Sequence, residues 1–156
     1  MADQTAAGAA AAAPILPVDP YRNYHFKLEI LGVTEGHFTA CTGLGIRVKP
    51  IRYREGGNNQ IVRAIPGPVE YADVRLRYGL TQSRELFDWL LKTIAGDIER
   101  RNVSIVMLEQ NGADEAFRWS LIRAWPSEWR GAPLEALGNQ VAIEELTLSY
   151  DSLERI

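Results

Sequence analysis

The chain has 156 residues, of which 46% are hydrophobic and 24% are charged, with 17 Lys and Arg against 20 Asp and Glu. This length fits one domain, and this balance is typical of a folded globular protein rather than a disordered or fibrous one. The formal net charge of −3 argues against a surface built wholly for nucleic acid. One cysteine excludes an intrachain disulfide and a multi-thiolate zinc site, and two histidines exclude a multi-histidine metal cage.

The N-terminal segment over 1–18 is rich in Ala and Pro. It lacks the basic start of a secretion signal, and an alanine run this short is a marginal helix in water. We therefore expect a flexible leader over 1–18, one folded domain over 19–156, and assembly in the cytoplasm with any export as part of a finished particle. No apolar run approaches the roughly 18 residues that a membrane-spanning helix requires, so no stable membrane insertion is expected.

Alternation of apolar and polar residues predicts strands through the first half of the domain. These strands cover, in chain order, Tyr24–Ile30, Gly36–Cys41, Ile46–Arg54, Ile61–Ile65 and Val69–Leu80. A break is expected at Gly43-Leu44-Gly45, and Pro66-Gly67-Pro68 is expected to interrupt the later strands. The segment from Arg54 to Ala64 is polar and glycine-rich, which predicts a long projecting hairpin with little apolar area.

One helix is predicted after these strands. Its apolar stripe at helical spacing is formed by Leu86, Trp89, Leu90 and Ile94, which indicates a face packed on a sheet. Thr81 or Ser83 can cap the start of this helix, and Gly96 can close its end.

The second half of the domain again has the alternation of strands. Val103–Glu109 and Ala116–Trp125 flank Asn111-Gly112, which predicts a hairpin with a type I′ turn. Pro126 is expected to end the return strand, and the last predicted strand is Val141–Tyr150. The fold class is therefore α+β, a mostly antiparallel small β-barrel or sandwich, closed or nearly so, with one flanking helix.

Residues typical of catalytic or metal sites occur without the partners that such chemistry needs. Cys41 has no evident base, and a single buried structural cysteine is the commoner case. His25 and His37 lack metal-ligand spacing, and Glu144 and Glu145 are neighbours on a strand and so face opposite ways. We therefore predict no enzyme activity and no cofactor.

Charge is unevenly distributed along the chain. From Gly43 to Leu80 there are seven cationic residues and three acidic ones, a local charge of +4 that leaves about −7 for the remainder. Two interpretations stay open: the wet face of strands with edge-protecting charges, or a face that meets an acidic surface on a partner or on another copy. The hairpin likewise is either a surface loop or a docking arm.

Several segments, in chain order, carry a family resemblance: Asp19–Phe26, Cys41–Leu44, Tyr53–Asn59, Gly79–Thr81, Leu86–Trp89, Arg101–Ile105, Ala124–Pro126, Ala142–Leu146 and the closing Leu153-Glu154-Arg155. Through them the chain from Asp19 onward resembles the tail tube protein family of contractile phage tails and extracellular injection systems. The resemblance implies a β-barrel subunit whose strands join those of its neighbours. It also implies six-copy rings stacked into a hollow conduit for cargo or DNA, with sheath and baseplate as partners.

The resemblance also implies roles for particular residues. It assigns contacts between successive rings to Tyr53, Arg54, Glu55, Gly56, Gly57, Asn58, Asn59 and Arg63. Arg75 and Arg77 are expected to face either the channel or a neighbouring subunit, since alternation alone leaves both faces open. The helix is expected outside the barrel, with part of its polar face available to a sheath.

Two other classes of protein remain as alternatives. The first is a binding module of the same fold, such as a tube-initiating ring or a carrier ring for secreted cargo. The second is a small-ligand-binding barrel or an unrecognised hydrolase, which needs converging polar groups in a pocket. The sequence does not display such a group, so the tube subunit is the leading hypothesis.

Overall fold

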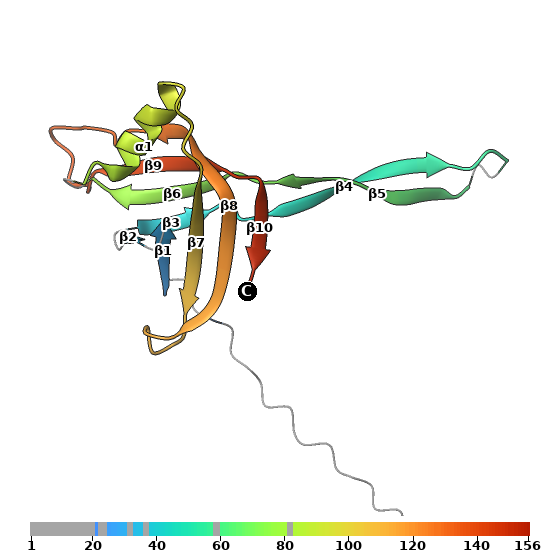
Figure 1. Cartoon of the computed structure of the whole chain (residues 1–156), viewed down its shortest axis with the longest axis horizontal. Coiled ribbons are helices and arrows are strands. Elements are labelled where there is room, and N and C mark those ends of the chain that lie inside the picture. Colours follow the sequence, from blue (N-terminus) through green and yellow to red (C-terminus); the bar gives the residue numbers. More distant parts are fainter. Residues whose placement is uncertain (1–20, 22–24, 31–32, 36–37, 58–59, 81–82) are drawn as a thin grey trace, which may run out of the picture.

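A computed structural model describes residues 21, 25–30, 33–35, 38–57, 60–80 and 83–156. The predicted leader lies outside these residues. Within them, one sheet has the strand order β2-β1-β7-β8-β9-β6-β3 with β10 added to β8, and β4 and β5 form a separate two-stranded ribbon (Figure 1). Among the described residues all strand pairings are antiparallel and one helix forms, so the predicted fold class is confirmed, although these residues do not close the sheet.

The elements have the following bounds: β1 Phe26–Ile30, β2 Val33–Glu35, β3 Phe38–Thr42, β4 Ile46–Arg54, β5 Val62–Tyr71, β6 Val74–Gly79, α1 Glu85–Ile94, β7 Arg101–Leu108, β8 Glu115–Arg130, β9 Ile143–Ser149 and β10 Ser152–Arg155.

Strand β8 joins the two halves of the sheet. Its first part pairs with β7 and β10, and its last part, from Trp125, pairs with β9. At the change of partner, Arg123 has a φ of 55° and donates its backbone N–H to Asn102 Oδ1 at 3.1 Å. Here Ile122 and Arg123 together oppose Asn102, which makes a bulge in β8. A bulge bends its strand, and β8 curves strongly, so that the two halves of the sheet face each other (Figure 1).

The core fills the space between these halves. Side chains from both halves and from the helix are almost fully buried there: Leu28, Val74, Leu76, Trp89, Val103, Leu121, Leu146 and Leu148. The pairing register explains why these residues are buried together, because directly opposed residues on neighbouring strands lie on the same face of a sheet. Leu28 pairs with Ile105, and Leu76 pairs with Leu146.

Helix α1 packs on β8 through part of the predicted stripe. Trp89 and Leu90 are buried, and the Trp89 indole donates to the Glu99 carbonyl oxygen at 2.7 Å. Leu86 packs against the core, whereas Ile94 departs from the expectation and is 71% exposed. Ile94 is the last residue of the helix, and its exposure shows that the packed face ends before it.

The ends of the helix follow the prediction in part. Gly96, with a φ of 89°, closes it as expected, with its N–H on Thr93 O and the next N–H on Lys92 O. The start is different: the N-cap is Arg84, which makes no side-chain capping hydrogen bond, so the cap predicted at Ser83 is wrong. Thr81 lies outside the described residues.

Three predictions about prolines and turns are wrong. Strand β5 runs through Pro66-Gly67-Pro68, and β8 continues through Pro126, which sits at a register shift opposite Leu148. The hairpin at Asn111-Gly112 forms, but Gly112 has a positive φ and Asn111 does not, so the turn is not type I′. Instead the Asn111 carboxamide oxygen accepts the N–H groups of Ala113 and Asp114.

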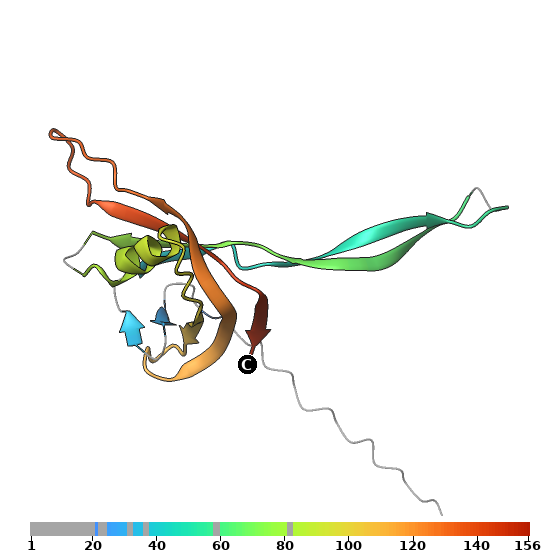
Figure 2. The same ribbon diagram turned by 45° about the horizontal axis from the view of Figure 1, so that its top comes forward.

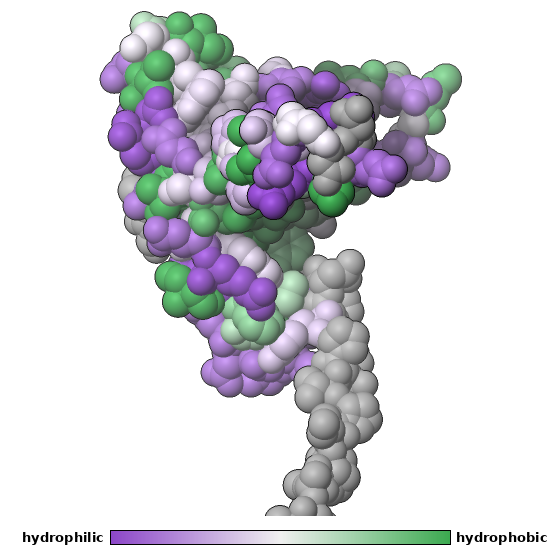
Figure 3. Space-filling model, turned by 90° about the vertical axis from the view of Figure 1, so that its right-hand side faces the viewer, coloured by the Kyte–Doolittle hydropathy of each residue, from purple (hydrophilic) through white to green (hydrophobic). Residues whose placement is uncertain are grey.

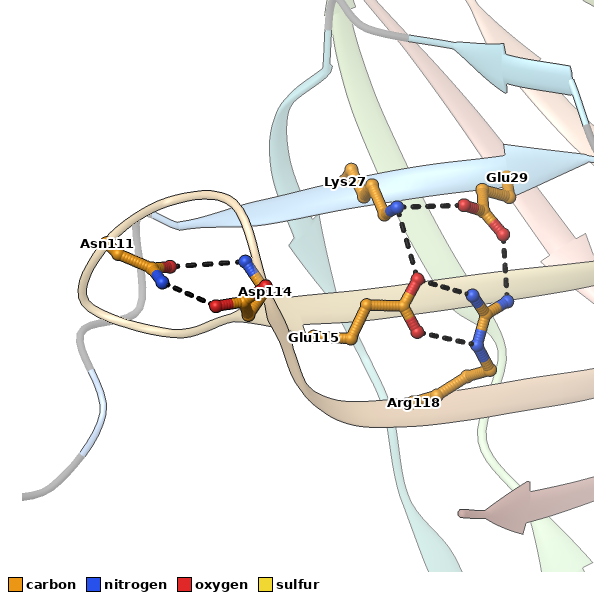
Figure 4. A network of polar contacts seen from close by, with 6 residues as sticks. All are labelled: Lys27, Glu29, Asn111, Asp114, Glu115 and Arg118. Carbon is orange, nitrogen blue, oxygen red and sulfur yellow. Dashed lines mark hydrogen bonds and ion pairs between the residues drawn. The ribbon is translucent and has the colours of Figure 1, made fainter.

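Beside this hairpin, four charged side chains form a network on the outer face of the sheet (Figure 4). Lys27 Nζ lies 3.0 Å from Glu29 and 3.1 Å from Glu115, and Arg118 lies 2.8 Å from Glu29 and 2.7 Å from Glu115. The register places Val106 between Lys27 and Arg118, and Val106 is fully buried. The stems of the two cations therefore help to cover an apolar residue on the outer face.

Replacing Leu76 by Ala tests the core. Because Leu76 is fully buried between β3 and β9, we expect the free energy of unfolding to fall by about 2–5 kcal/mol. Denaturant unfolding measures it. The matched change Ile98→Ala, at a residue that is 54% exposed, should shift the free energy of unfolding by no more than about 0.5 kcal/mol. Equal losses would contradict the assigned core.

The charged network predicts a pH dependence. Hydrogen bonds from Arg118 and then Lys27 hold the pKa of the Glu29 carboxyl below its ordinary value. A carboxyl with a lowered folded-state pKa stabilises the protein above its unfolded-state pKa, and this stability is lost as the pH falls through the folded-state pKa. Unfolding followed from neutral pH to about pH 3 should therefore show a shallower acid decline for Glu29→Gln than for the parent chain. An unchanged decline would show that the network does not form in solution.

Candidate functional site

The β4–β5 ribbon projects from the body as a long arm (Figures 1 and 2). Every residue of β4 is exposed, and nearly all of β5 is. An isolated two-stranded hairpin is at best marginally stable in water. The arm therefore lacks, within the described chain, the packing that normally stabilises a sheet.

The base of the arm is tightly built. Gly43 has a φ of 91°, and a Cβ there would collide with the Asp73 carbonyl oxygen. The Ser149 hydroxyl donates to the Asp73 carboxylate at 2.8 Å, and the Tyr71 ring lies 5.8 Å from that of Tyr150. These contacts set the direction in which the arm leaves the body.

Apolar side chains of the arm change faces half way along it. In the half near the body, Ile46 and Val48 share a face with their partners Tyr71 and Val69. Beyond Pro50, the residues of that face are Arg52 and Arg54, paired with Ala64 and Val62. The opposite face is then the one that carries Ile51 and Tyr53, with Ile65 paired to Ile51.

The arm also turns over at its middle. Strand β5 lies above β4 near the body and below it near the tip (Figures 1 and 2). A bulge lies between these halves, where Gly67 and Pro68 together oppose Lys49, and bulges increase strand twist. Only glycine fits at 67, since a Cβ would collide with the Lys49 carbonyl oxygen. Because the apolar residues switch face where the ribbon turns over, both apolar halves point to one side of the arm.

The other side of the arm carries four of its five cations, together with Ala64 and Val62. Arg47 and Lys49 lie there near the body, and Arg52 and Arg54 lie there near the tip. Among described residues none of these four has an ion-pair partner, whereas Arg63 pairs with Glu55 at 3.2 Å. With five cations and two carboxylates between Ile46 and Tyr71, the arm has a net charge of +3. Seen toward its tip, hydrophilic and hydrophobic side chains both reach the surface (Figure 3).

The residues predicted for ring stacking lie in the outer part of this arm. Tyr53 and Arg54 end β4, Glu55, Gly56 and Gly57 follow at the tip, and Arg63 is in β5. Asn58 and Asn59 lie outside the described residues. The arm spans Ile46–Tyr71 rather than Arg54–Ala64. The expectation of little apolar area in Arg54–Ala64 is wrong, since Ile61 and Val62 are 58% and 41% exposed there.

Arg75 and Arg77 lie on the solvent face of β6, opposite to the buried Val74 and Leu76. The register places Arg77 beside Glu145 of β9, which in turn opposes Arg130 of β8. This face is therefore polar and of mixed charge. At its two borders lie β3 and the last part of β8, each of which pairs on one side only within the described chain.

A second exposed region lies at the end of the molecule opposite the arm (Figures 1 and 2). The loop between β8 and β9 carries Leu134, Leu137 and Val141, which are 86%, 95% and 78% exposed. From 131 to 145 the chain has three carboxylates, on Glu135, Glu144 and Glu145, and no Lys or Arg. Glu145 opposes Arg77 and Arg130, and Glu144 accepts a hydrogen bond from Trp129, so the loop itself is apolar with Glu135 as its one charged side chain.

The described residues hold little that suggests catalysis. Burial raises the pKa of the Cys41 thiol to about 11, which disfavours the thiolate that a nucleophile requires. Cys41 lines a cavity of about 510 Å³ whose other walls are mainly apolar, including Phe26, Phe38 and Trp119. No metal-binding group of side chains and no helix long and apolar enough to cross a membrane occurs in the described part of the chain. His37 is outside it.

The sequence did not predict three features of the structure. Most apolar residues of the arm share one side, contacts of Gly43 and Asp73 hold the base of the arm, and an exposed apolar loop lies at the far end. A signal for the first is present: apolar residues of β4 occupy even positions up to Val48 and odd positions from Ile51, so the pattern changes phase at Pro50. The contact of Gly43 with Asp73 joins residues 30 apart, which no local pattern reveals.

The family model of the T4-like virus tail tube protein gp19 matches residues 22–154. No curated protein sequence matches the chain. Among solved structures, the chain is similar to one in the tube-terminating cap of the anti-feeding prophage, at 22% identity and a TM-score of 0.85, over 94% of this chain and 97% of that one.

Two further structures come from PVC, an extracellular contractile injection system. A chain of its sheath–tube complex in the extended state is 25% identical with a TM-score of 0.80, over 88% of this chain and 91% of that one. A chain of its sheath/tube terminator is 25% identical with a TM-score of 0.82, over 89% and 98%. These relatives are structural tube proteins rather than enzymes. The match over nearly the whole described chain shows that this protein belongs to the T4-like virus tail tube protein gp19 family.

Proposed function

We propose that this chain is the subunit of a hollow inner tube in a phage tail or an extracellular contractile injection particle. The observation that carries the proposal is the arm, whose apolar side is uncovered in the single chain although a ribbon of this kind needs cover. In a tube, the arms of one ring contact the next ring. The tip residues Tyr53 to Gly57, with Arg63, lie where such contacts begin.

Ring formation uses the open borders at β3 and at the last part of β8. Strand β3 runs antiparallel to β6, β6 to β9, and β9 to the last part of β8. Strand β3 of one copy therefore lies antiparallel to β8 of the next, and the strand directions keep alternating from one copy to the next. A head-to-tail contact of this type closes into a ring when the rotation is right, and closure removes edges that invite aggregation.

The resemblance to tail tube proteins supports six copies in each ring. In such a ring the polar face that carries Arg75 and Arg77 lines the channel through which cargo or DNA passes, because the opposite face is buried in the core. The likeness to a chain of the PVC sheath–tube complex supports a sheath as a partner outside the ring. The family resemblance implies a baseplate at one end. Assembly takes place in the cytoplasm.

A terminal ring is the second candidate function. The likeness to a chain of the PVC sheath/tube terminator, over 98% of that chain, favours it. A terminator or an initiator forms one layer at the end of a tube, whereas a main tube subunit stacks without limit. The two differ in whether the purified protein forms long tubes or single rings.

Deleting Glu55 to Asn59 tests the role of the tip. We expect the variant to form folded monomers or rings and no long tubes, because the body contributes the core and the tip contributes only contacts between rings. Electron microscopy measures tube length, and circular dichroism confirms the fold. Long tubes from the variant would contradict the stacking assignment, and single rings from the parent chain would favour the terminal ring.

Gly43→Ala tests the base of the arm. A Cβ at this position meets the Asp73 carbonyl oxygen and requires an unfavourable positive φ, a cost of about 1–3 kcal/mol that the chain avoids by shifting the arm. We expect fewer and shorter tubes in electron micrographs. The matched change Gly96→Ala also requires a positive φ but has nothing within 4 Å of the new Cβ, and because Gly96 lies outside the arm it should leave tube length unchanged. Equal tube lengths for both variants would show that the direction of the arm is not important.

A further inference from the structure

A cavity of about 510 Å³ lies between the two halves of the sheet. Strands β1, β7 and β8 form its wall on one side, and β3 together with Leu44 forms its wall on the other. A cavity of this size can hold several aliphatic side chains. Large apolar side chains of its walls are only half-buried in the described chain: Phe26, Phe38, Met107 and Trp119. The core is therefore incomplete at this place.

A row of side chains connects the cavity with Tyr21. Met107, which lines the cavity, is directly opposed by Phe26 on β1 and by Phe117 on β8. The Tyr21 ring meets the Phe117 ring edge-on with 5.0 Å between the ring centroids, and its hydroxyl donates to Glu109 Oε1 at 3.3 Å. Because directly opposed residues lie on the same face of a sheet, Tyr21 stands beside the wall of the cavity.

The segment Pro14–Val18, which comes shortly before Tyr21 and lies outside the described residues, has a composition that suits an apolar cavity. It has three aliphatic residues and no charge, and its two prolines lack the backbone N–H group whose burial without a partner is costly. The three residues from Val18 to Tyr21 span at most about 11 Å, and the six from Ile15 span at most about 22 Å. The aliphatic residues of the segment are therefore within reach of the cavity.

The connection through the chain favours this segment over a separate molecule as the occupant. A segment of the same chain makes the contact without the loss of translational and rotational freedom that the association of two molecules costs. A short connection also gives the segment a high effective concentration at the cavity.

We propose that the segment Pro14–Val18 docks in the cavity of its own chain, with the side chains of Ile15, Leu16 and Val18 among the half-buried apolar side chains of the walls. The N-terminal leader then completes the core where the sheet leaves it open. This inference concerns a single chain, so it does not depend on the formation of tubes.

Alkylation of Cys41 tests the proposal, because this residue lines the cavity. One variant carries Ile15→Asp and Leu16→Asp, and burial of an unpaired charge in an apolar site is strongly unfavourable. We expect iodoacetamide to react with Cys41 about tenfold faster in this variant than in the parent chain, because the segment no longer covers the cavity. Mass spectrometry follows the reaction at one pH for all proteins, since burial raises the pKa of Cys41 to about 11 and makes the reaction slow.

The matched control carries Ala10→Asp and Ala11→Asp. It adds the same charge to the leader outside the docking segment, so the alkylation rate should equal that of the parent chain. Equal rates in all three proteins overturn the proposal. Equal acceleration by both pairs of substitutions overturns it as well, because the effect would then come from charge in the leader rather than from the docking segment.

Photo-crosslinking identifies the occupant directly. A diazirine amino acid in place of Leu16 should give, after irradiation, a product within one chain that maps to peptides with Phe26, Met107 or Trp119. This product, together with faster alkylation of the Ile15 and Leu16 variant alone, supports the proposal. A product between two chains overturns docking in the same chain and assigns the cavity to a contact between copies. A product elsewhere in the chain, or no product at the cavity, also overturns the proposal whatever the alkylation rates are.

Discussion

The uncovered apolar side of the arm is the constraint on which the proposed assembly depends. A two-stranded ribbon has no second layer, so side chains such as Ile51 and Ile65 find no cover within the described chain. Most other features follow from this need. Pro50 and Pro66 have no backbone N–H, which removes edge donors that would invite unwanted strand pairing. The bulge at Gly67 turns the ribbon so that most of its apolar residues share one side. Gly43 fixes the direction in which the arm leaves the body.

The body supplies what the arm lacks. One sheet bends at β8 and closes over a core of aliphatic side chains and Trp89, so the body has its own hydrophobic stabilisation. Its outer face carries charges that are already paired, as in the network of Lys27, Glu29 and Arg118. The arm cations, by contrast, are mostly unpaired among the described residues. Ion pairs thus cover part of the body, whereas four arm cations are left without a described ion pair where contacts between copies are proposed.

Prolines show where local patterns mislead. Pro66, Pro68 and Pro126 suggested interruptions, yet β5 and β8 run through them. Proline is excluded from a strand only where its N–H is needed by a neighbour, and these residues lie at ladder edges or bulges. The Ile94 prediction failed for a related reason: helical spacing places it on the apolar stripe, but the packed face of the helix ends before it. Conversely, β4 begins and ends at the predicted residues, because its alternation is bounded by glycines on both sides.

By itself the sequence determined the antiparallel strands, the single helix with Trp89 and Leu90 inward, the cationic central segment and the resemblance to tail tube proteins. These features depend on local alternation, spacing and composition, which can be read from residues close together in the chain. Only the tertiary structure decided that β3 and the last part of β8 are unpaired borders of an open sheet, that most apolar residues of the arm share one side, and that an exposed apolar loop lies at the opposite end. These features depend on the register between strands that are distant in the sequence, and on which side chains stay outside the core. Both are set by contacts between residues far apart in the sequence.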